Sequence, residues 1–167
     1  PDLKWMDPAC GIGNLSIIAY LKLMHSLPSK TKKYDLSTPK KRHKHIIQNM
    51  LHMVELDRRN YNIARKIFGK TANIYNGSFL TSNFKKVNPV IIDRFNLSCF
   101  DVIIGNPPWN KMRRIIVTNG NNKHIDGGKS LWDKFIIGAF QILKQNGYLC
   151  FITPSGWRGP GVHYKMW

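Results

Sequence analysis

The residues Asn106, Pro107, Pro108 and Trp109 directly follow the β-branched run Phe100–Gly105. The two prolines lack backbone N–H donors and stiffen the loop, so its carbonyls are free to accept hydrogen bonds. The Asn106 carboxamide oxygen and the Pro107 carbonyl could together accept both hydrogens of a planar aromatic amino group. Accepting both draws the nitrogen toward tetrahedral geometry and frees its lone pair, while Trp109 offers a flat face for stacking. Taken alone, the tetrapeptide would be better explained as a proline turn with a core tryptophan.

A second candidate group lies near the N-terminus. It is a turn made of Asp7, Pro8, Ala9, Cys10, Gly11, Ile12 and Gly13. The turn follows the apolar run Leu3–Met6 and precedes a helical pattern over Asn14–Leu27, with Asn14 as the expected N-cap. Glycines here let the backbone approach a ligand without obstruction from Cβ, and the helix N-terminus favours an anionic group. The turn lacks the Gly-Lys-Ser/Thr of a Walker A loop and the third glycine of the dinucleotide fingerprint.

Two acidic residues lie at the end of the next strand-like segment, Met50–Glu55: Glu55 is its last residue, and Asp57 follows two residues later. In nucleoside-binding doubly wound folds, an acidic side chain at this place accepts hydrogen bonds from the ribose hydroxyls. An acidic residue directly before a helix can instead cap it. We assign the ligand role to Glu55 and the cap to Asp57, because a helical pattern over Arg58–Phe68 begins at the next residue and ends at Gly69.

Strand and helix patterns alternate along the rest of the chain. We expect strands over Ala72–Phe79 and Tyr148–Thr153, a mobile loop over Ile116–Gly128, and a helix over Leu131–Lys144 closed by Asn146-Gly147. The alternation predicts an α/β fold, with a mostly parallel sheet and helices on both faces. Ligands of such sheets bind at the carboxyl ends of the strands, where both candidate groups fall.

The charge of the chain is its most unusual bulk property. Its 167 residues suffice for one domain, and 26 Lys and Arg against nine Asp and Glu leave a formal charge of +17. This excess favours a polyanionic partner such as nucleic acid. Much of it is concentrated in the polar stretch 29–45, which we interpret as an exposed basic insertion. A solvated loop and a contact to the DNA backbone explain this stretch equally well.

Cysteines and hydropathy exclude several other classes of protein. Cys10, Cys99 and Cys150 are scattered, without the spacing of a disulfide framework or a zinc site, so no metal site is expected. No apolar run approaches the roughly 18 residues that a membrane span needs, and no signal peptide is visible. A reducing, cytoplasmic compartment is therefore the expectation.

Together and in this order, Asp7–Gly13 and Asn106–Trp109 resemble the signature motifs of γ-type adenine-N6 DNA methyltransferases. This group includes the methylase modules of type I and type IIG restriction-modification enzymes. The resemblance covers nearly the whole chain, including Leu131–Pro154. It implies a Rossmann-like S-adenosylmethionine-dependent methyltransferase fold, truncated at both ends and without its target-recognition domain. It further implies double-stranded DNA as the partner and methyl transfer to N6 of a flipped-out adenine. The expected location is the cytoplasm, in a bacterial, phage or viral host cell context.

The resemblance also implies roles for individual residues. The Asp7–Gly13 turn would line the methionine part of the cofactor, Glu55 would hold the ribose, and Leu56 would lie beside the adenine ring. The loop Asn106–Trp109 would hold the target base. The chain departs from the family at Ser78, where an acidic residue usually binds the cofactor's adenine amine, while Phe79 would keep a stacking contact.

Several alternatives remain open. N4-cytosine methyltransferases usually begin the tetrapeptide with Ser, so Asn106 favours adenine. C5-cytosine chemistry needs a cysteine in a Pro-Cys context, which this chain lacks. Enzymes that methylate glutamine side chains or ribosomal RNA amines share an Asn-Pro-Pro-aromatic loop but generally lack the Asp-Pro-Ala-Cys opening. A non-catalytic nucleic-acid-binding module is the alternative from a different class. The oligomeric state, the recognition sequence and any attached nuclease lie beyond this sequence.

Overall fold

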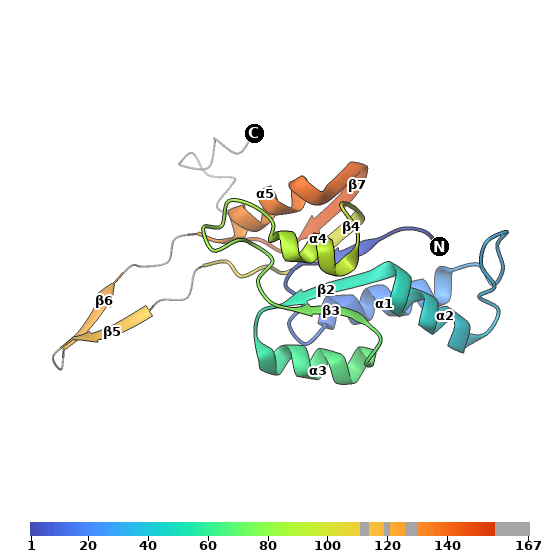
Figure 1. The fold of residues 1–167 in the computed structure, drawn as a ribbon, viewed down its shortest axis with the longest axis horizontal. Coiled ribbons are helices and arrows are strands. Elements are labelled where there is room, and N and C mark those ends of the chain that lie inside the picture. Colours follow the sequence, from blue (N-terminus) through green and yellow to red (C-terminus); the bar gives the residue numbers. More distant parts are fainter. Residues whose placement is uncertain (111–113, 119–120, 126–129, 156–167) are drawn as a thin grey trace.

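A computed structural model describes residues 1–110, 114–118, 121–125 and 130–155, without the side chains of 114–118 and 121–125. Its centre is a five-stranded sheet, and every strand pair in it is parallel. The strands stand in the order β3 (Asn73–Asn76), β2 (Leu51–Glu55), β1 (Trp5–Asp7), β4 (Phe100–Gly105) and β7 (Leu143–Phe151). The predicted α/β class with a parallel sheet is therefore confirmed (Figure 1).

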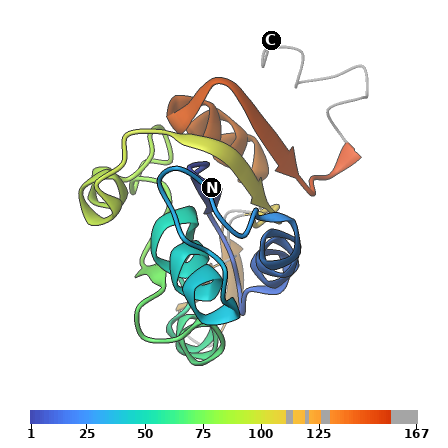
Figure 2. The same cartoon turned by 90° about the vertical axis from the view of Figure 1, so that its right-hand side faces the viewer.

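Helices cover both faces of this sheet, as predicted (Figure 2). On one face α4 (Pro89–Phe95) and α5 (Trp132–Ile142) pack on Met6, Val54 and Ile103. On the other, α1 (Asn14–Ser26) packs around Leu51 and α3 (Arg58–Phe68) around Met53. Successive strand residues point to opposite faces, so a strand buried on both sides is apolar throughout its length.

Local signals fixed the boundaries of several elements. The helix α3 spans the predicted Arg58–Phe68, with Asp57 as N-cap and Gly69 as C-cap, and β4 spans the predicted Phe100–Gly105. The prediction that Asn14 caps α1 is wrong, because the N-cap is Gly13. Its φ of 100° suits glycine, and an added Cβ would lie 2.5 Å from the Phe68 ring.

The basic stretch 29–45, expected to be an exposed insertion, is only partly a loop. Its second half is the helix α2 (Pro39–His45), which continues into the π-helical turn η1 (Ile46–Met50) and then β2. The Thr38 hydroxyl accepts a hydrogen bond from the Lys41 amide, and Pro39 stands at the start of the helix. Both are favourable helix-start residues, which the lysine-rich composition obscured.

Other boundaries also differ from the prediction. The expected loop Ile116–Gly128 includes the end of strand β5 (Arg114–Thr118) and all of the antiparallel strand β6 (Asn121–Ile125), while 119–120 and 126–128 lie outside the described residues. The helix α5 ends at Ile142 rather than Lys144, because Leu143 already pairs with Phe100 of β4. Strand β3 is shorter than predicted, so that Ser78 and Phe79 follow it. Within the described part of the chain, no helix is long and apolar enough to cross a membrane.

Candidate functional site

The two candidate motifs meet where the direction of the strand order reverses. From β1 the chain builds outward through β2 to β3, and it then returns to place β4 on the other side of β1. In open parallel sheets this switch point forms the crevice in which ligands bind. A Cβ built on Gly105, at the end of β4, would lie 3.3 Å from Pro8 Cδ and 3.4 Å from Asp7 Oδ1. The loop Asn106–Trp109 therefore starts directly against the Asp7–Gly13 turn.

Hydrogen bonds hold the Asp7–Gly13 turn to the neighbouring strand ends. The Cys10 amide donates to the Val54 carbonyl at 3.0 Å, and the Gly11 amide donates to Glu55 Oε2 at 2.7 Å. At the end of β3, the Asn76 side-chain amide donates to the Glu55 carbonyl at 2.9 Å. The carboxyl ends of β1, β2 and β3 thus form one connected edge.

Asp7 is the most perturbed acid at this edge. Its side chain is 3% exposed, and burial raises the pKa of its carboxyl to about 7. Hydrogen bonds from the Ser16 hydroxyl at 2.9 Å and the Ala9 amide at 3.3 Å act in the opposite direction but do not offset the burial. The result is a buried carboxyl that changes charge near neutral pH.

At the end of β2, Glu55 is buried and Leu56 is exposed. Glu55 is buried, and its two carboxylate oxygens accept the Gly11 and Asp57 amides, so it orients the turn. Each carboxylate oxygen can accept a further hydrogen bond, which leaves capacity for a ligand hydroxyl. Leu56 is 71% exposed, an apolar side chain open to contact. Asp57 accepts the Arg59 and Asn60 amides, which confirms its predicted role as the cap of α3.

Ser78 and Phe79 differ in how well they match their expected roles. The Ser78 hydroxyl donates to the Leu80 carbonyl at 2.7 Å, and its lone pairs remain able to accept. Phe79 is 2% exposed and stacks on Phe135 at a centroid distance of 5.4 Å, inside the core. The Phe79 ring is thus enclosed by the core in this structure, and its expected stacking on a ligand stays a prediction.

The loop after β4 presents its polar and aromatic groups outward. Asn106 and Pro108 are exposed, Pro107 is buried, and Trp109 is 47% exposed rather than a core residue. The Asn106 carboxamide makes no hydrogen bond to any residue that the structure describes, so its oxygen is available. The Trp109 carbonyl accepts the Leu131 amide at 2.9 Å, which fastens the loop to the start of α5.

Sequence reasoning missed three residues that shape this edge. Ser16 holds the Asp7 carboxyl, Asn76 ties β3 to β2, and Gly105 allows the close approach of β4 to the turn. Ser16 is buried among the apolar residues of α1, one turn from the glycines, and that position is a usable signal. Asn76 and Gly105 end their strands, but only the strand order reveals what they contact.

Space for a ligand lies in front of the turn. Gly11 has a φ of 59°, and no atom lies within 4 Å of where its Cβ would be. Beside Gly11, the Glu55 carboxylate accepts the Gly11 amide and the next residue, Leu56, is exposed, so polar and apolar groups both lie near this open position. Among the described residues, no group of three or more His, Cys, Asp or Glu is arranged to hold a metal ion.

Known proteins resemble the chain in both sequence and fold. It is 37% identical over 70 residues to a candidate type II restriction enzyme and methyltransferase of Methanocaldococcus jannaschii, covering 40% of this chain and 6% of that protein. It is 29% identical over 87 residues to an uncharacterised adenine-specific methylase of Mycoplasma pneumoniae, covering 52% of this chain and 19% of the relative. The matched regions thus span less than a fifth of either relative.

The fold also matches a chain in the cryoEM structure of the DrdV–DNA complex. The TM-score is 0.57 at 21% identity, over 93% of this chain and 18% of the other. At this identity the match establishes the fold alone. The model of the Eco57I restriction-modification methylase family matches residues 13–166, which include the loop Asn106–Trp109, Glu55, Leu56 and Ser78 but not Asp7–Ile12. This chain therefore belongs to the Eco57I restriction-modification methylase family.

Proposed function

We propose that this chain is the catalytic region of a DNA methyltransferase, which moves a methyl group from S-adenosylmethionine to N6 of an adenine flipped out of double-stranded DNA. The observation that carries the proposal is the contact of Gly105 with Pro8 and Asp7, which sets the Asn106 loop beside the glycine turn. Membership of the restriction-modification methylase family and the likeness to an adenine-specific methylase support it.

The residues at the strand ends fit S-adenosylmethionine. Bound there, it would supply a methyl group activated by the sulfonium. Asp7 and the turn would hold its methionine part, the Glu55 carboxylate its ribose hydroxyls, and Leu56 and Ser78 its adenine. Asp7 in its charged form would be favoured by an aminium group of the ligand, which compensates for the burial that raises its pKa.

The loop Asn106–Trp109 would act on the target base. The Asn106 oxygen and the Pro107 carbonyl accept the two hydrogens of the adenine amino group, which makes the nitrogen lone pair available. The exposed face of Trp109 stacks on the extruded base, and Pro108 stiffens the loop. Positioning of the two reactants would supply much of the catalysis. As the bond from nitrogen to the methyl carbon formed, the bond from sulfur to that carbon would break to leave a neutral thioether, and the proton lost from the nitrogen would pass to solvent, so a dedicated general base is not required.

The test uses the intact protein, tritiated S-adenosylmethionine and duplex DNA. Replacing Asn106→Ala removes one acceptor from the amino group, and we expect transfer to fall by about 10²- to 10³-fold. The control Asn110→Ala changes an exposed asparagine four residues later and should stay within about twofold of the unchanged protein. Label in DNA that is equal for both variants would overturn the assigned role of Asn106, and label found in protein instead would overturn the substrate.

Cofactor binding gives a separate test of the cofactor assignment. Equilibrium dialysis with labelled S-adenosylmethionine should show binding to the unchanged protein and to Asn106→Ala alike, because Asn106 is assigned to the base. Absence of binding at millimolar concentration would favour the reading as a non-catalytic nucleic-acid-binding module.

A further inference from the structure

The stretch 29–45, here called the basic module, carries charge that the proposed catalytic site does not use. It contains seven Lys and Arg residues and one acidic residue, Asp35, for a formal charge of +6. Its positive residues are Lys30, Lys32, Lys33, Lys40, Lys41, Arg42 and Lys44. A solvated loop and a nucleic-acid contact are both consistent with this composition, so the structure has to distinguish them.

The backbone of the basic module is held in place. Leu36 is 2% exposed and packs in a core cluster with Ile46 and Met50. The Arg42 guanidinium donates to the Met24 carbonyl at 2.5 Å and to the Leu36 carbonyl at 3.4 Å. An arginine held by backbone carbonyls serves the fold rather than a partner. The module is thus an ordered part of the domain.

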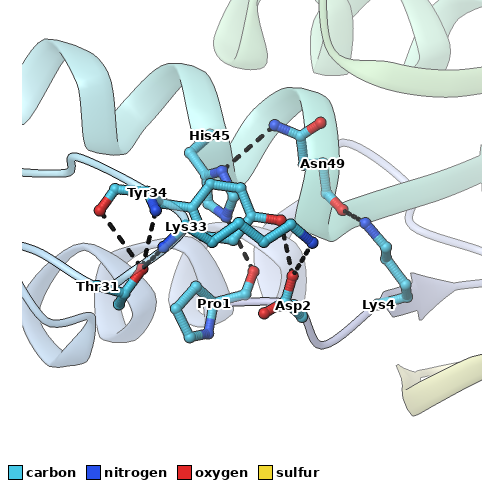
Figure 3. A network of polar contacts seen from close by, with 8 residues as sticks. All are labelled: Pro1, Asp2, Lys4, Thr31, Lys33, Tyr34, His45 and Asn49. Carbon is cyan, nitrogen blue, oxygen red and sulfur yellow. Dashed lines mark hydrogen bonds and ion pairs between the residues drawn. The ribbon is translucent and has the colours of Figure 1, made fainter.

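A polar network fastens the basic module to the N-terminal segment (Figure 3). The Asp2 carboxylate accepts hydrogen bonds from the Tyr34 hydroxyl at 2.7 Å and the Lys33 ammonium at 3.0 Å. The His45 ring bonds to the Pro1 carbonyl at 2.9 Å and tilts against the Tyr34 ring. Because both sides of the module are anchored, the lysines that point outward start from fixed backbone positions.

The lysines of the module divide into two groups. Lys33 pairs with Asp2 and Lys41 with Asp35. The other four are exposed, and their ammonium groups form no ion pair or hydrogen bond with any described residue; they are Lys30, Lys32, Lys40 and Lys44. On a surface that only needs solubility, lysines are commonly interspersed with acidic residues. Here the nearby carboxylates of Asp2 and Asp35 pair with Lys33 and Lys41 instead.

The basic module lies at the opposite end of the sheet from the Asn106 loop. It leads through η1 into the first residue of β2, whereas the candidate site follows the last residues of β1 and β4. Five residues of β2 at about 3.3 Å each separate the two ends by roughly 16 Å. Figure 1 shows α2 and the β5–β6 pair at opposite ends, and Figure 2 views the molecule from the α2 end.

We infer that the basic module binds the phosphate backbone of duplex DNA at a surface separate from the catalytic edge. Lysine ammonium groups act as point charges for phosphates, and the four unpaired ones extend from both the loop and α2. A phosphate bound here is not one that flanks the base at Asn106, given the separation along β2. Because a phosphate does not reveal the identity of the base, the contact is independent of sequence, and it holds DNA outside the target site.

The test measures the salt dependence of DNA binding by the intact protein. The probe is a 5′-labelled duplex of about 30 bp without a known target sequence, titrated over a series of KCl concentrations. Each lost phosphate contact reduces the slope of log K against log[salt] by about 0.9. For Lys40→Gln combined with Lys44→Gln we expect the slope to fall by about 2, which corresponds to a loss of affinity of about 60-fold at 0.1 M salt.

A matched variant separates local contact from overall charge. Lys22→Gln with Lys66→Gln also removes two exposed lysines from helices, on α1 and α3, and should change the slope much less. Equal changes in both variants, or no change in the α2 variant, would overturn the inference. If thermal melting shows the α2 variant unfolded, Lys30→Gln with Lys32→Gln tests the loop half under the same criteria. Asn106→Ala should keep the full slope, so failure of the methylation proposal would not be mistaken for failure of this one.

Discussion

Replacing Asp7 with asparagine should remove a pH-dependent weakness from the folded protein. Asp7 is 3% exposed, and burial raises its pKa from 3.8 to about 7. Below pH 4 the carboxyl is protonated in both the folded and the unfolded chain and has no effect on stability. Between pH 4 and 7 the unfolded chain loses the proton while the folded chain keeps it, so stability declines as pH rises through this window.

The size of the effect follows from the pKa difference. One unit corresponds to about 1.4 kcal/mol, so about three units correspond to about 4 kcal/mol over the whole window. Roughly two of these units lie between pH 5 and pH 7. We therefore expect the unfolding free energy of Asp7→Asn, relative to the unchanged protein, to rise by about 3 kcal/mol between pH 5 and pH 8.

The assay is urea unfolding at pH 5, 6, 7 and 8, without cofactor, for both proteins. The comparison isolates Asp7, because buried His52, whose pKa is lowered to about 4 by burial, acts equally in both. The His52 effect has the opposite sign, since stability falls as pH drops from 6.5 to 4. A constant difference between the two proteins over this range, or one that shrinks as pH rises, would refute the reasoning.

Further predictions concern the Asp7–Gly13 turn and the helix α3. Gly13→Ala should destabilise the fold by about 3 kcal/mol, because it combines a positive φ with a Cβ 2.5 Å from the Phe68 ring. Gly11→Ala, which also has a positive φ but open space, should cost about 1 kcal/mol in the same urea titration; equal costs would contradict the packing argument. Asp57→Ala should lower stability by about 1 kcal/mol through loss of the α3 cap, whereas Asp57→Asn should retain most of it. A loss with asparagine as large as with alanine would show that charge, not capping geometry, matters at this position.

Elements defined by local signals were predictable from the sequence. The α3 boundaries follow from a capping aspartate and a terminal glycine, and β4 follows from a β-branched run. The α2 helix was missed because its lysine-rich sequence has little apolar periodicity, and its fold depends on Leu36 and Arg42 contacting distant residues. The helix α4 was not predicted either, because the segment 80–99 that contains it has no long periodic pattern.

The two motifs of the candidate site were predictable from the sequence, but most contacts that hold them together were not. Parallel strands bring their carboxyl ends to one edge, so the proximity of the two motifs follows from the fold class. The hydrogen bond from Ser16 to Asp7 and the approach of Gly105 to Pro8 depend on packing between separate elements. The burial of Phe79 against Phe135 has the same origin, since a sequence motif does not specify which aromatic residue the core will enclose.

The central claim is that the Asn106 loop acts on an adenine amino group. The most direct measurement digests duplex DNA to nucleosides after reaction of the intact protein with tritiated S-adenosylmethionine, and separates them by chromatography. The account predicts label in N6-methyladenine, reduced about 10²-fold or more by Asn106→Ala and unaffected by Asn110→Ala. Label in N4-methylcytosine, or transfer to DNA that persists in Asn106→Ala, would contradict it.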